Sequence, residues 1–389
     1  MTQTLPGPTL GVVGGGQLGR MLAEAAAPLG VEVVVLDPTP DCPAATVARD
    51  QVVGDFDDPD AFADLAARTD ALTFEIELAD PDLLERVGGE ADVPVHPSPD
   101  TLRLIEDKLV QKRALGDADI PVPAFHRVDD AADLRDALDE FGAVMLKART
   151  GGYDGRGNVP VEDESDAEAA LDAVGGPAMA ENFVDFAREL SVIGVKGRDE
   201  VRTFPAGENV HREEILRETI VPARTRDEVL DRAQSVAHDV LDVMEGRGVY
   251  GIELFETREG EILVNEIAPR PHNSGHWTIE GAHTSQFEQH VRAVLGWPLG
   301  PAERRDATVM TNALGDVSET QEATLRGVGD VLETPGAHLH WYGKRDVRPL
   351  RKMGHVTVVP TDDASADVET LLRTARDLRD GLTFTGASE

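Results

Sequence analysis

Cysteine and long apolar stretches are scarce in this 389-residue chain. The single cysteine, Cys42, excludes an internal disulfide framework and a zinc site built on several thiolates. No apolar run reaches the roughly 18 residues that a membrane-spanning helix needs. Residues 1–7 lack the basic and apolar regions of a secretory signal peptide, so we expect a cytoplasmic location.

Basic residues are also scarce: 37 Lys and Arg stand against 73 Asp and Glu, which leaves a net charge of −36. Only six of the 37 are lysines. This charge argues against binding nucleic acid through the surface as a whole. It resembles proteins adapted to concentrated salt, where a Debye length near ~3 Å at about 1 M screens self-repulsion. We therefore predict loss of structure at low salt; an ordinary acidic protein is the alternative.

The first hundred residues read as an open α/β unit. An apolar run at 10–13 ends in Gly14, Gly16 and Gly19, a helix pattern follows from Leu18, and a strand at 31–36 closes with Asp37. This arrangement matches the dinucleotide fingerprint, with the ribose-binding acid about 20 residues on. Any tight strand-to-helix turn also favours glycine. Three readings stay open: an NAD site, a different ligand on the same turn (which we favour), and purely structural glycines.

Two acids follow the predicted strand at 72–74, at the edge where open α/β sheets bind ligands. We interpret Glu77 as a solvated acid and leave the role of Glu75 open. Ser98 can cap a helix that has Pro99 at its first position, which marks a domain boundary. That helical region would carry Lys108 and Lys112 on one face.

A glycine-rich loop at 151–157 follows the predicted strand 144–147, whose last residue is Lys147. Lys147 and Arg156, within the loop, supply cations for phosphate oxygens. No Gly-Lys-Ser/Thr opens a helix here, so the segment is not a Walker loop. A strand at 159–161 follows instead, which predicts a flap that covers the phosphates.

Two acids among apolar residues mark a candidate metal site in a predicted hairpin, 249–256 and 261–267. With a four-residue loop, position 256 opposes 261, and Glu266 lies diagonal to Glu253 on one face. Diagonal Cβ atoms lie about 7–8 Å apart, within reach of one or two hard cations. We predict Mg²⁺ here, with partly exposed strand acids as the alternative. In this register Asn265 points to the other face and is left out.

The polar loop 268–278 leaves the second strand and should lie beside the ion. Ser285 and Glu288 then form a capping box for a helix that closes the domain. His272 could be a base, a substrate contact or a satisfied structural histidine.

These motifs together resemble the ATP-grasp superfamily and, more narrowly, the N5-carboxyaminoimidazole ribonucleotide synthases. The resemblance runs along nearly the whole chain, and its most specific part is Asn-Ser-Gly-His-Trp-Thr at 273–278. It implies a pre-ATP-grasp domain with an open parallel α/β sheet (1–98), a two-lobed ATP-grasp domain (99–298) and a small C-terminal domain (299–389). The implied reaction joins bicarbonate to 5-aminoimidazole ribonucleotide at the expense of ATP, through carboxyphosphate, in purine biosynthesis.

By matching position, the resemblance implies several sets of site residues. Mg²⁺ would bind Glu253 and Glu266, and the catalytic groups would be Arg270, His272 and Lys352. ATP would contact Lys108, Lys147, Gly152, Tyr153, Asp154, Gly155, Arg156, Gly157, Asn158, Glu181, Val184, Glu189 and His211. The aminoimidazole ribonucleotide would contact Gln17, Leu18, Glu75, Tyr153, Asp154, Arg156, Arg270, His272, Asn273, Ser274, Arg351 and Lys352.

One implied contact has independent support, because five of the twelve residues at 341–352 are basic in a very acidic chain. We interpret this cluster as a phosphate site, with local charge balancing as the alternative. Three positions depart from the family pattern: Asn158 stands for Gln, Leu350 for Gly, and Asn182-Phe183 replaces a pair that often includes Gln. These departures put flap and hinge contacts in doubt, and not the reaction.

The resemblance also implies partners: a homodimer, and a mutase that takes the unstable carbamate. Two other functions stay open. One is another ATP-grasp ligase with a different acid or amine; the more distant one is an NAD-dependent dehydrogenase, or a binding module, built on the first βαβ unit.

Overall fold

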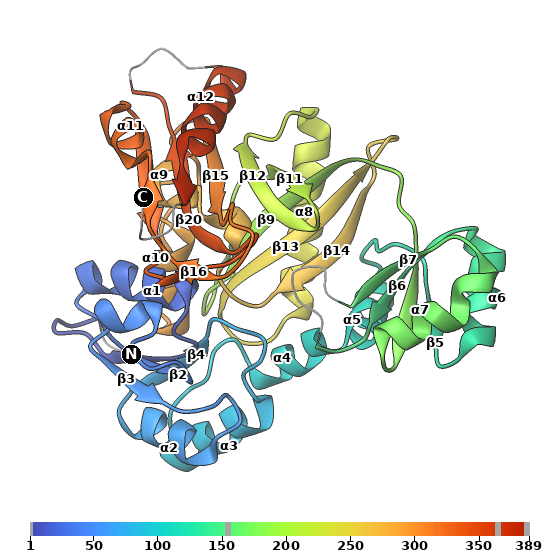
Figure 1. The fold of residues 1–389 in the computed structure, drawn as a ribbon. Coiled ribbons are helices and arrows are strands. Elements are labelled where there is room, and N and C mark those ends of the chain that lie inside the picture. Colours follow the sequence, from blue (N-terminus) through green and yellow to red (C-terminus); the bar gives the residue numbers. More distant parts are fainter. Residues whose placement is uncertain (1–2, 152–156, 362–366, 385–389) are drawn as a thin grey trace.

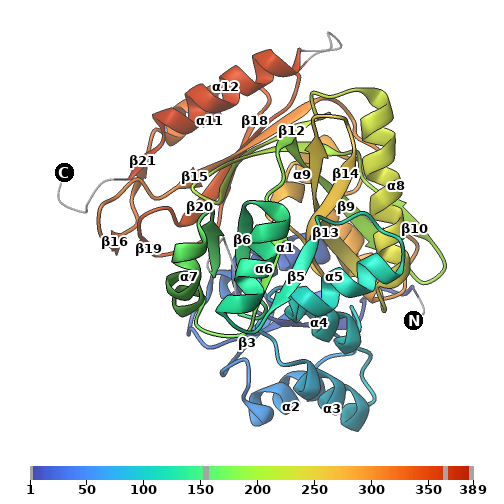
Figure 2. The same cartoon turned by 90° about the vertical axis from the view of Figure 1, so that its right-hand side faces the viewer.

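The computed structural model describes residues 3–151, 157–361 and 367–384. Figure 1 shows the N-terminal domain in blue at the lower left and the C-terminal part in orange and red at the upper left, where its strands continue a large central sheet; a small lobe in teal and green lies at the right. After a 90° turn, this lobe lies in front of the large sheet (Figure 2). Among the described residues, no helix has both the length and the apolar character needed to cross a membrane.

The N-terminal sheet is parallel, as predicted for the first hundred residues, and its strand order is β3-β2-β1-β4. Side chains of α1 pack on one face, and those of α2 and α3 on the other. Asp58 and Asp80 cap α2 and α3, each followed by a proline that suits the first helical position. The elements are β1 (Thr9–Val13), α1 (Gln17–Ala26), η1 (Ala27–Leu29), β2 (Glu32–Asp37), η2 (Pro43–Thr46), β3 (Asp50–Val53), α2 (Pro59–Ala67), β4 (Ala71–Phe74) and α3 (Pro81–Ala91).

Two short helices lead from this domain into the small lobe. Ser98 caps the first of them, as predicted, but this helix ends at Glu106 and Asp107 caps a second, so the expected single helical region is two helices. The lobe itself is an antiparallel sheet of order β5-β8-β6-β7 with α6 and α7 on one face. The elements are α4 (Pro99–Glu106), α5 (Lys108–Asp117), β5 (Phe125–Val128), α6 (Ala131–Phe141), β6 (Val144–Ala148), β7 (Asn158–Val161), η3 (Glu164–Asp166), α7 (Ala167–Val174) and β8 (Ala178–Asn182).

The large antiparallel sheet has the order β14-β13-β9-β11-β12-β15-β20-β18, with β10 paired to β9. Helix α8 covers one face of β9, β13 and β14, where the alternating residues Leu190, Ile252 and Leu254 form a core. The elements up to residue 294 are β9 (Phe186–Lys196), β10 (Val201–Thr203), β11 (Gly207–Arg212), β12 (Ile215–Val221), α8 (Asp227–Val243), β13 (Gly248–Thr257), β14 (Ile262–Ala268), η4 (Asn273–Gly275), α9 (Thr278–Gly281) and α10 (Gln286–Val294).

The same sheet continues beyond residue 298, because β15 pairs with β12 on one side and with β20 on the other. Helix α12 packs on this part through Leu371, Leu372 and Ala375. The remaining elements are β15 (Thr308–Leu314), β16 (Gln321–Glu322), β17 (Leu325–Arg326), α11 (Val328–Glu333), β18 (Ala337–Trp341), β19 (Asp346–Val347), β20 (Lys352–Val358), α12 (Val368–Gly381) and β21 (Thr383–Phe384).

Candidate functional site

The glycine turn between β1 and α1 is built around two carboxylates of the chain itself. The amide of Gly15 donates to Asp37 Oδ2 at 2.9 Å, and that of Gly16 donates to Glu75 Oε1 at 2.5 Å. A Cβ on Gly14 or Gly16 would lie 2.5 or 2.8 Å from atoms of Glu75, so the glycines make room for this acid. The amides that a dinucleotide phosphate would need are therefore in use, and Asp37 binds the turn itself.

Glu75 is buried at the end of β4, and its surroundings set its charge. Burial raises the pKa of Glu75 to about 7, although the Gly16 amide and the nearby Arg270 favour the carboxylate. Arg270 also pairs with Glu77, Nη2 to Oε1 at 2.8 Å. Our interpretation of Glu77 as a solvated acid was wrong. The loop after β14 folds back onto the N-terminal sheet, a long-range contact that local pattern does not reveal.

The basic cluster near the C-terminus faces the same turn. Lys344 Nζ donates to Gln17 Oε1 at 2.9 Å and to the Lys352 carbonyl at 2.6 Å. Burial and the neighbouring cations Arg351 and Lys352 lower the pKa of Lys344 to about 7. An anion beside Lys344 would relieve this repulsion, as expected of a phosphate site. We had singled out the cluster but not Lys344 itself as a contact.

Leu350, one of the departures from the family pattern, has a backbone conformation that suits glycine. Its φ of 61° lies in the left-handed region, where a side chain is strained and glycine is not. The loop before Lys352 keeps this conformation although Leu stands where Gly is expected.

Glu253 on β13 and Glu266 on β14 are direct cross-strand partners, not diagonal ones as predicted. A β-bulge shifts the register, so that 254 pairs with 264 while 253 pairs with 266, and the hairpin loop is one residue longer than expected. Our register of 256 opposite 261 was wrong, because 256 pairs with 262. The correction brings the two acids closer together, since directly opposed Cβ atoms lie about 4.5–5.5 Å apart.

The two glutamates differ in their surroundings. Burial raises the pKa of Glu253 to about 7; His211 opposes this rise, and the carboxylates of Glu266 and Glu189 add to it. Desolvation also raises the pKa of Glu266, but Lys108 and Lys147 outweigh it and the net shift is downward. Carboxylates gathered without enough cations around Glu253 form a hard oxygen-donor set that suits a divalent ion.

Lysine side chains reach this site from the small lobe. Lys147 Nζ lies 2.7 Å from Glu181 Oε1 and 3.4 Å from Asn265 Oδ1, and Lys108 Nζ lies 3.6 Å from Glu266 Oε1. Leaving Asn265 out was therefore wrong: the bulge at this position turns its amide toward Lys147. A bulge cannot be foreseen from residue alternation alone.

His272 stands between the metal-site acids and the N-terminal turn. Its Nδ1 contacts Ser274 Oγ at 2.8 Å, and its Nε2 lies 3.8 Å from Glu253 Oε1. Burial, reinforced by Arg270 and Lys352, lowers the pKa of His272 well below its usual value, so the imidazole is neutral. Gln286 holds the backbone of His272 from both sides, at 2.9 and 2.7 Å. We had missed Gln286, because it lies 14 residues away on α10.

Two further pairs complete the site. Glu189 on β9 and His211 on β11 form an ion pair; burial lowers the pKa of His211, but Glu189 outweighs it and raises the pKa overall. Asn273 and Asn312 exchange amide hydrogen bonds of 3.1 and 2.7 Å, which join the loop after β14 to β15.

Family models match the chain in three consecutive segments: a ribonucleotide synthetase preATP-grasp domain at residues 8–106, an ATP-grasp domain at 113–287 and a phosphoribosylaminoimidazole carboxylase C-terminal domain at 308–369. An N5-carboxyaminoimidazole ribonucleotide synthase of Brucella melitensis is 42% identical over 361 residues, 92% of this chain and 97% of the relative. The chain belongs to the N5-carboxyaminoimidazole ribonucleotide synthase family. It is thus an ATP-grasp enzyme of the ATP-dependent ligase type.

Solved structures of the family agree over nearly the full length. The synthetase of Thermotoga maritima is 40% identical with a TM-score of 0.87, covering 98% of this chain and 100% of its own. The Aspergillus clavatus synthase, solved in complex with ADP and 5-aminoimidazole ribonucleotide, is 35% identical with a TM-score of 0.88, covering 97% and 100%. The family fold predicted from the motifs is confirmed.

Part of the predicted synthase site lies outside the described residues: Gly152, Tyr153, Asp154, Gly155 and Arg156. At the edge of this segment, Asn158 pairs with Lys147 across β6 and β7, and Gly157 accepts a hydrogen bond from Ala148 at 2.8 Å. These contacts place Gly157 and Asn158 beside the end of β6, next to Lys147.

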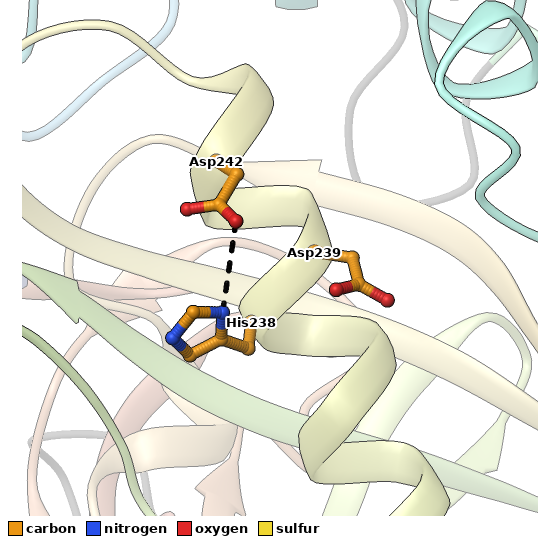
Figure 3. Close-up of side chains that lie close together, drawn as sticks. All are labelled: His238, Asp239 and Asp242. Atoms are coloured by element: carbon orange, nitrogen blue, oxygen red, sulfur yellow. Dashed lines mark ion pairs between the residues drawn. The ribbon is translucent and has the colours of Figure 1, made fainter.

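A second group of possible metal ligands lies on α8. His238 Nδ1 is 3.8 Å from Asp242 Oδ2, and one ligand atom each of His238, Asp239 and Asp242 lies within 4.8 Å of the other two (Figure 3). All three side chains are exposed on the outer face of the helix. Exposed acids one helical turn from a histidine are common on acidic surfaces, so this group is not assigned to the synthase reaction.

Proposed function

We propose that the chain carboxylates 5-aminoimidazole ribonucleotide with bicarbonate and ATP, giving N5-carboxyaminoimidazole ribonucleotide, ADP and phosphate in purine biosynthesis. The observation that carries this proposal is the loop after β14. Arg270 pairs with Glu77 of the N-terminal domain, and two residues later His272 lies 3.8 Å from Glu253. One short loop thus joins the cation-rich nucleotide cleft to the glycine turn, so two bound substrates would meet there.

The nucleotide cleft would hold ATP between the small lobe and the large sheet. Lys108 and Lys147 would bind its phosphates, with Glu181, Val184, Glu189 and His211 along the rest of the cleft. Glu253 and Glu266 would hold Mg²⁺, because opposed carboxylates with too few cations nearby fit a divalent ion. When bound, the ion neutralises charge on the phosphate oxygens. Gly152, Gly155, Gly157 and Asn158 would complete the phosphate contacts.

The ribonucleotide would lie across the glycine turn. Its phosphate suits the basic cluster, where burial and the neighbouring cations Arg351 and Lys352 lower the pKa of Lys344 to about 7. Gln17, Leu18, Glu75, Arg270, Asn273 and Ser274 would surround the remainder, together with Tyr153, Asp154 and Arg156.

The reaction asks three things of the chain. Bicarbonate must be phosphorylated to carboxyphosphate, so cations such as Arg270 and Lys352 would stabilise the developing negative charge. The exocyclic amine must then attack the carbonyl carbon of carboxyphosphate; the bond from this carbon to the phosphate oxygen breaks, phosphate leaves, and the nitrogen loses a proton. His272 is neutral and its ring is fixed by Ser274, so it could accept that proton. Water must be kept away from the labile mixed anhydride, which a closed loop over the cleft would do.

The test is ADP release in molar KCl, with and without bicarbonate and aminoimidazole ribonucleotide. We expect rapid release only when both are present. Release supported by a different acid or amine would favour another ATP-grasp ligase. Protection of the protein from unfolding by NADH but not by ATP would favour a nucleotide-dependent dehydrogenase.

Several broader features belong to the same proposal. We propose the domain division 1–98, 99–298 and 299–389, a cytoplasmic homodimer, and transfer of the unstable carbamate to a mutase that moves its carboxylate from nitrogen to carbon. We also propose salt adaptation, since a charge of −36 repels itself in dilute buffer. An unchanged melting temperature between low and molar KCl would contradict that last point.

A further inference from the structure

Lys112, one of the six lysines, is deeply buried next to Glu181, the carboxylate that also contacts Lys147. Its side chain is only 2% exposed. The ammonium group lies 2.9 Å from Glu181 Oε2 on β8 and donates to the carbonyl of Val264 on β14 at 2.8 Å. One side chain of α5 therefore ties strand β8 of the small lobe to strand β14 of the large sheet.

The contact with Glu181 also sets the net charge of the group of side chains around Lys147. Glu181 is buried between the two lysines, with Oε1 2.7 Å from Lys147 and Oε2 2.9 Å from Lys112. Two ammonium groups around one carboxylate leave this triad with one net positive charge. Without Lys112, Glu181 would be paired with Lys147 alone. This pair would carry no net charge, and it would therefore attract phosphate far less.

The contact with Val264 holds the strand that carries the metal-site acid. Val264 lies just before the β-bulge that turns Asn265 toward Lys147 and places Glu266 opposite Glu253. Its amide donates to the Pro121 carbonyl at 2.8 Å, so Val264 is held on both sides. Losing the bond from Lys112 would free the carbonyl at the point where the strand departs from regular pairing.

We propose that Lys112 is a positioning residue for phosphoryl transfer from ATP, acting through Glu181 and Val264. By sharing Glu181 it leaves Lys147 free to bind phosphate, and by holding Val264 it fixes the bulged end of β14. Its burial keeps it from touching the nucleotide. This inference rests on the proposed function, and it assigns Lys112 to the ATP half of the reaction alone.

The test compares Lys112→Met with a matched variant, Lys196→Met. Lys196 lies at the end of β9 in the large sheet, is partly buried, and donates to two backbone carbonyls, of Leu241 and Met244, at 2.8 and 2.6 Å. We expect Lys112→Met to raise the KM for ATP about tenfold or more, with a smaller fall in kcat and an unchanged KM for aminoimidazole ribonucleotide. Lys196→Met should lower the melting temperature but leave the KM for ATP unchanged.

A second readout needs no turnover. At a fixed concentration, ADP raises the melting temperature by an amount that grows with the logarithm of its affinity, and this increment should shrink in Lys112→Met but not in Lys196→Met. If Lys112→Met does not fold, Lys112→Gln decides, because its amide can still donate to Glu181 or Val264 while the charge is gone.

Two results would overturn the inference: a KM for ATP within about twofold of wild type, or an unchanged increment from ADP, in whichever of these variants is folded. A wild-type chain that releases no ADP with both substrates would instead contradict the proposed function. The ADP increment would still test Lys112 in that case.

Discussion

Two regions of this molecule have the sequence features of an anion-binding site: the glycine turn after β1 and the surroundings of Lys147. In the structure, the first region has its donor groups already occupied, and the second keeps a positive charge. At the turn after β1, the amides of Gly15 and Gly16 donate hydrogen bonds to the carboxylates of Asp37 and Glu75. In the cleft, Lys147 shares its carboxylate partner with a second lysine, so that positive charge is left over. The lesson is that glycines permit close approach, but the neighbouring charges decide what approaches.

The largest effect should come from the two opposed acids in the cleft. We expect Glu253→Gln or Glu266→Gln to lower kcat about 100- to 1,000-fold, because a neutral amide weakens the hold on a divalent ion. ADP release under saturating substrates is the measurement. Glu261→Gln, an exposed position beside the tip of the same hairpin, is the control and should retain full activity. Near-normal turnover in Glu266→Gln would mean that these acids do not hold a divalent ion needed for the reaction.

The next effect tests the other region. Lys344→Met should raise the KM for aminoimidazole ribonucleotide about tenfold or more, since a charge-assisted hydrogen bond contributes about 1.5–3 kcal/mol. It should leave the KM for ATP unchanged. Arg345 belongs to the same basic stretch, but its side chain is 74% exposed and lies 3.8 Å from Asp41, outside the group formed by Lys344, Arg351 and Lys352; the control variant Arg345→Met should therefore bind normally. A larger effect on ATP than on the ribonucleotide would reverse the assignment of the two sites.

A third prediction concerns the role of the glycines in the turn after β1. Gly14 has a φ of 105°, and a Cβ there would lie 2.5 Å from Glu75 Cγ. Gly14→Ala should therefore lower the free energy of unfolding by about 2–3 kcal/mol, measured with urea in molar KCl. Gly89→Ala, in helix α3 with open space around the new methyl group, should be neutral or stabilising. Equal stabilities for the two variants would mean that the turn is not built around Glu75.

The smallest effect is a pH dependence. The pKa of Glu75 is raised to about 7 in the folded chain, so the native state holds a proton that the unfolded state has lost. This carboxyl should cost stability progressively between about pH 4.5 and pH 7, with the full cost above that range. Glu75→Gln should then gain stability relative to wild type from pH 5 to pH 8, by an amount on the order of 2 kcal/mol. A constant difference across that range would mean that Glu75 titrates normally.

Much of the fold and part of the candidate site could be predicted from the sequence, wherever a local sequence pattern specifies the structure. The parallel order of the first sheet, the capped helix at Ser98 and the family fold all follow from signals within short stretches of chain. What failed was long-range or irregular. Glu77 meets Arg270 across almost two hundred residues, and the bulge at Asn265 breaks the alternation on which the hairpin register rested.

The most direct test of the central claim is a crystal of the chain soaked with Mn²⁺ and ADP, examined by anomalous scattering. The account predicts a manganese peak between the carboxylates of Glu253 and Glu266, with nucleotide beside Lys147. A peak only at the exposed group on α8, or nucleotide bound across residues 14–19, would contradict it.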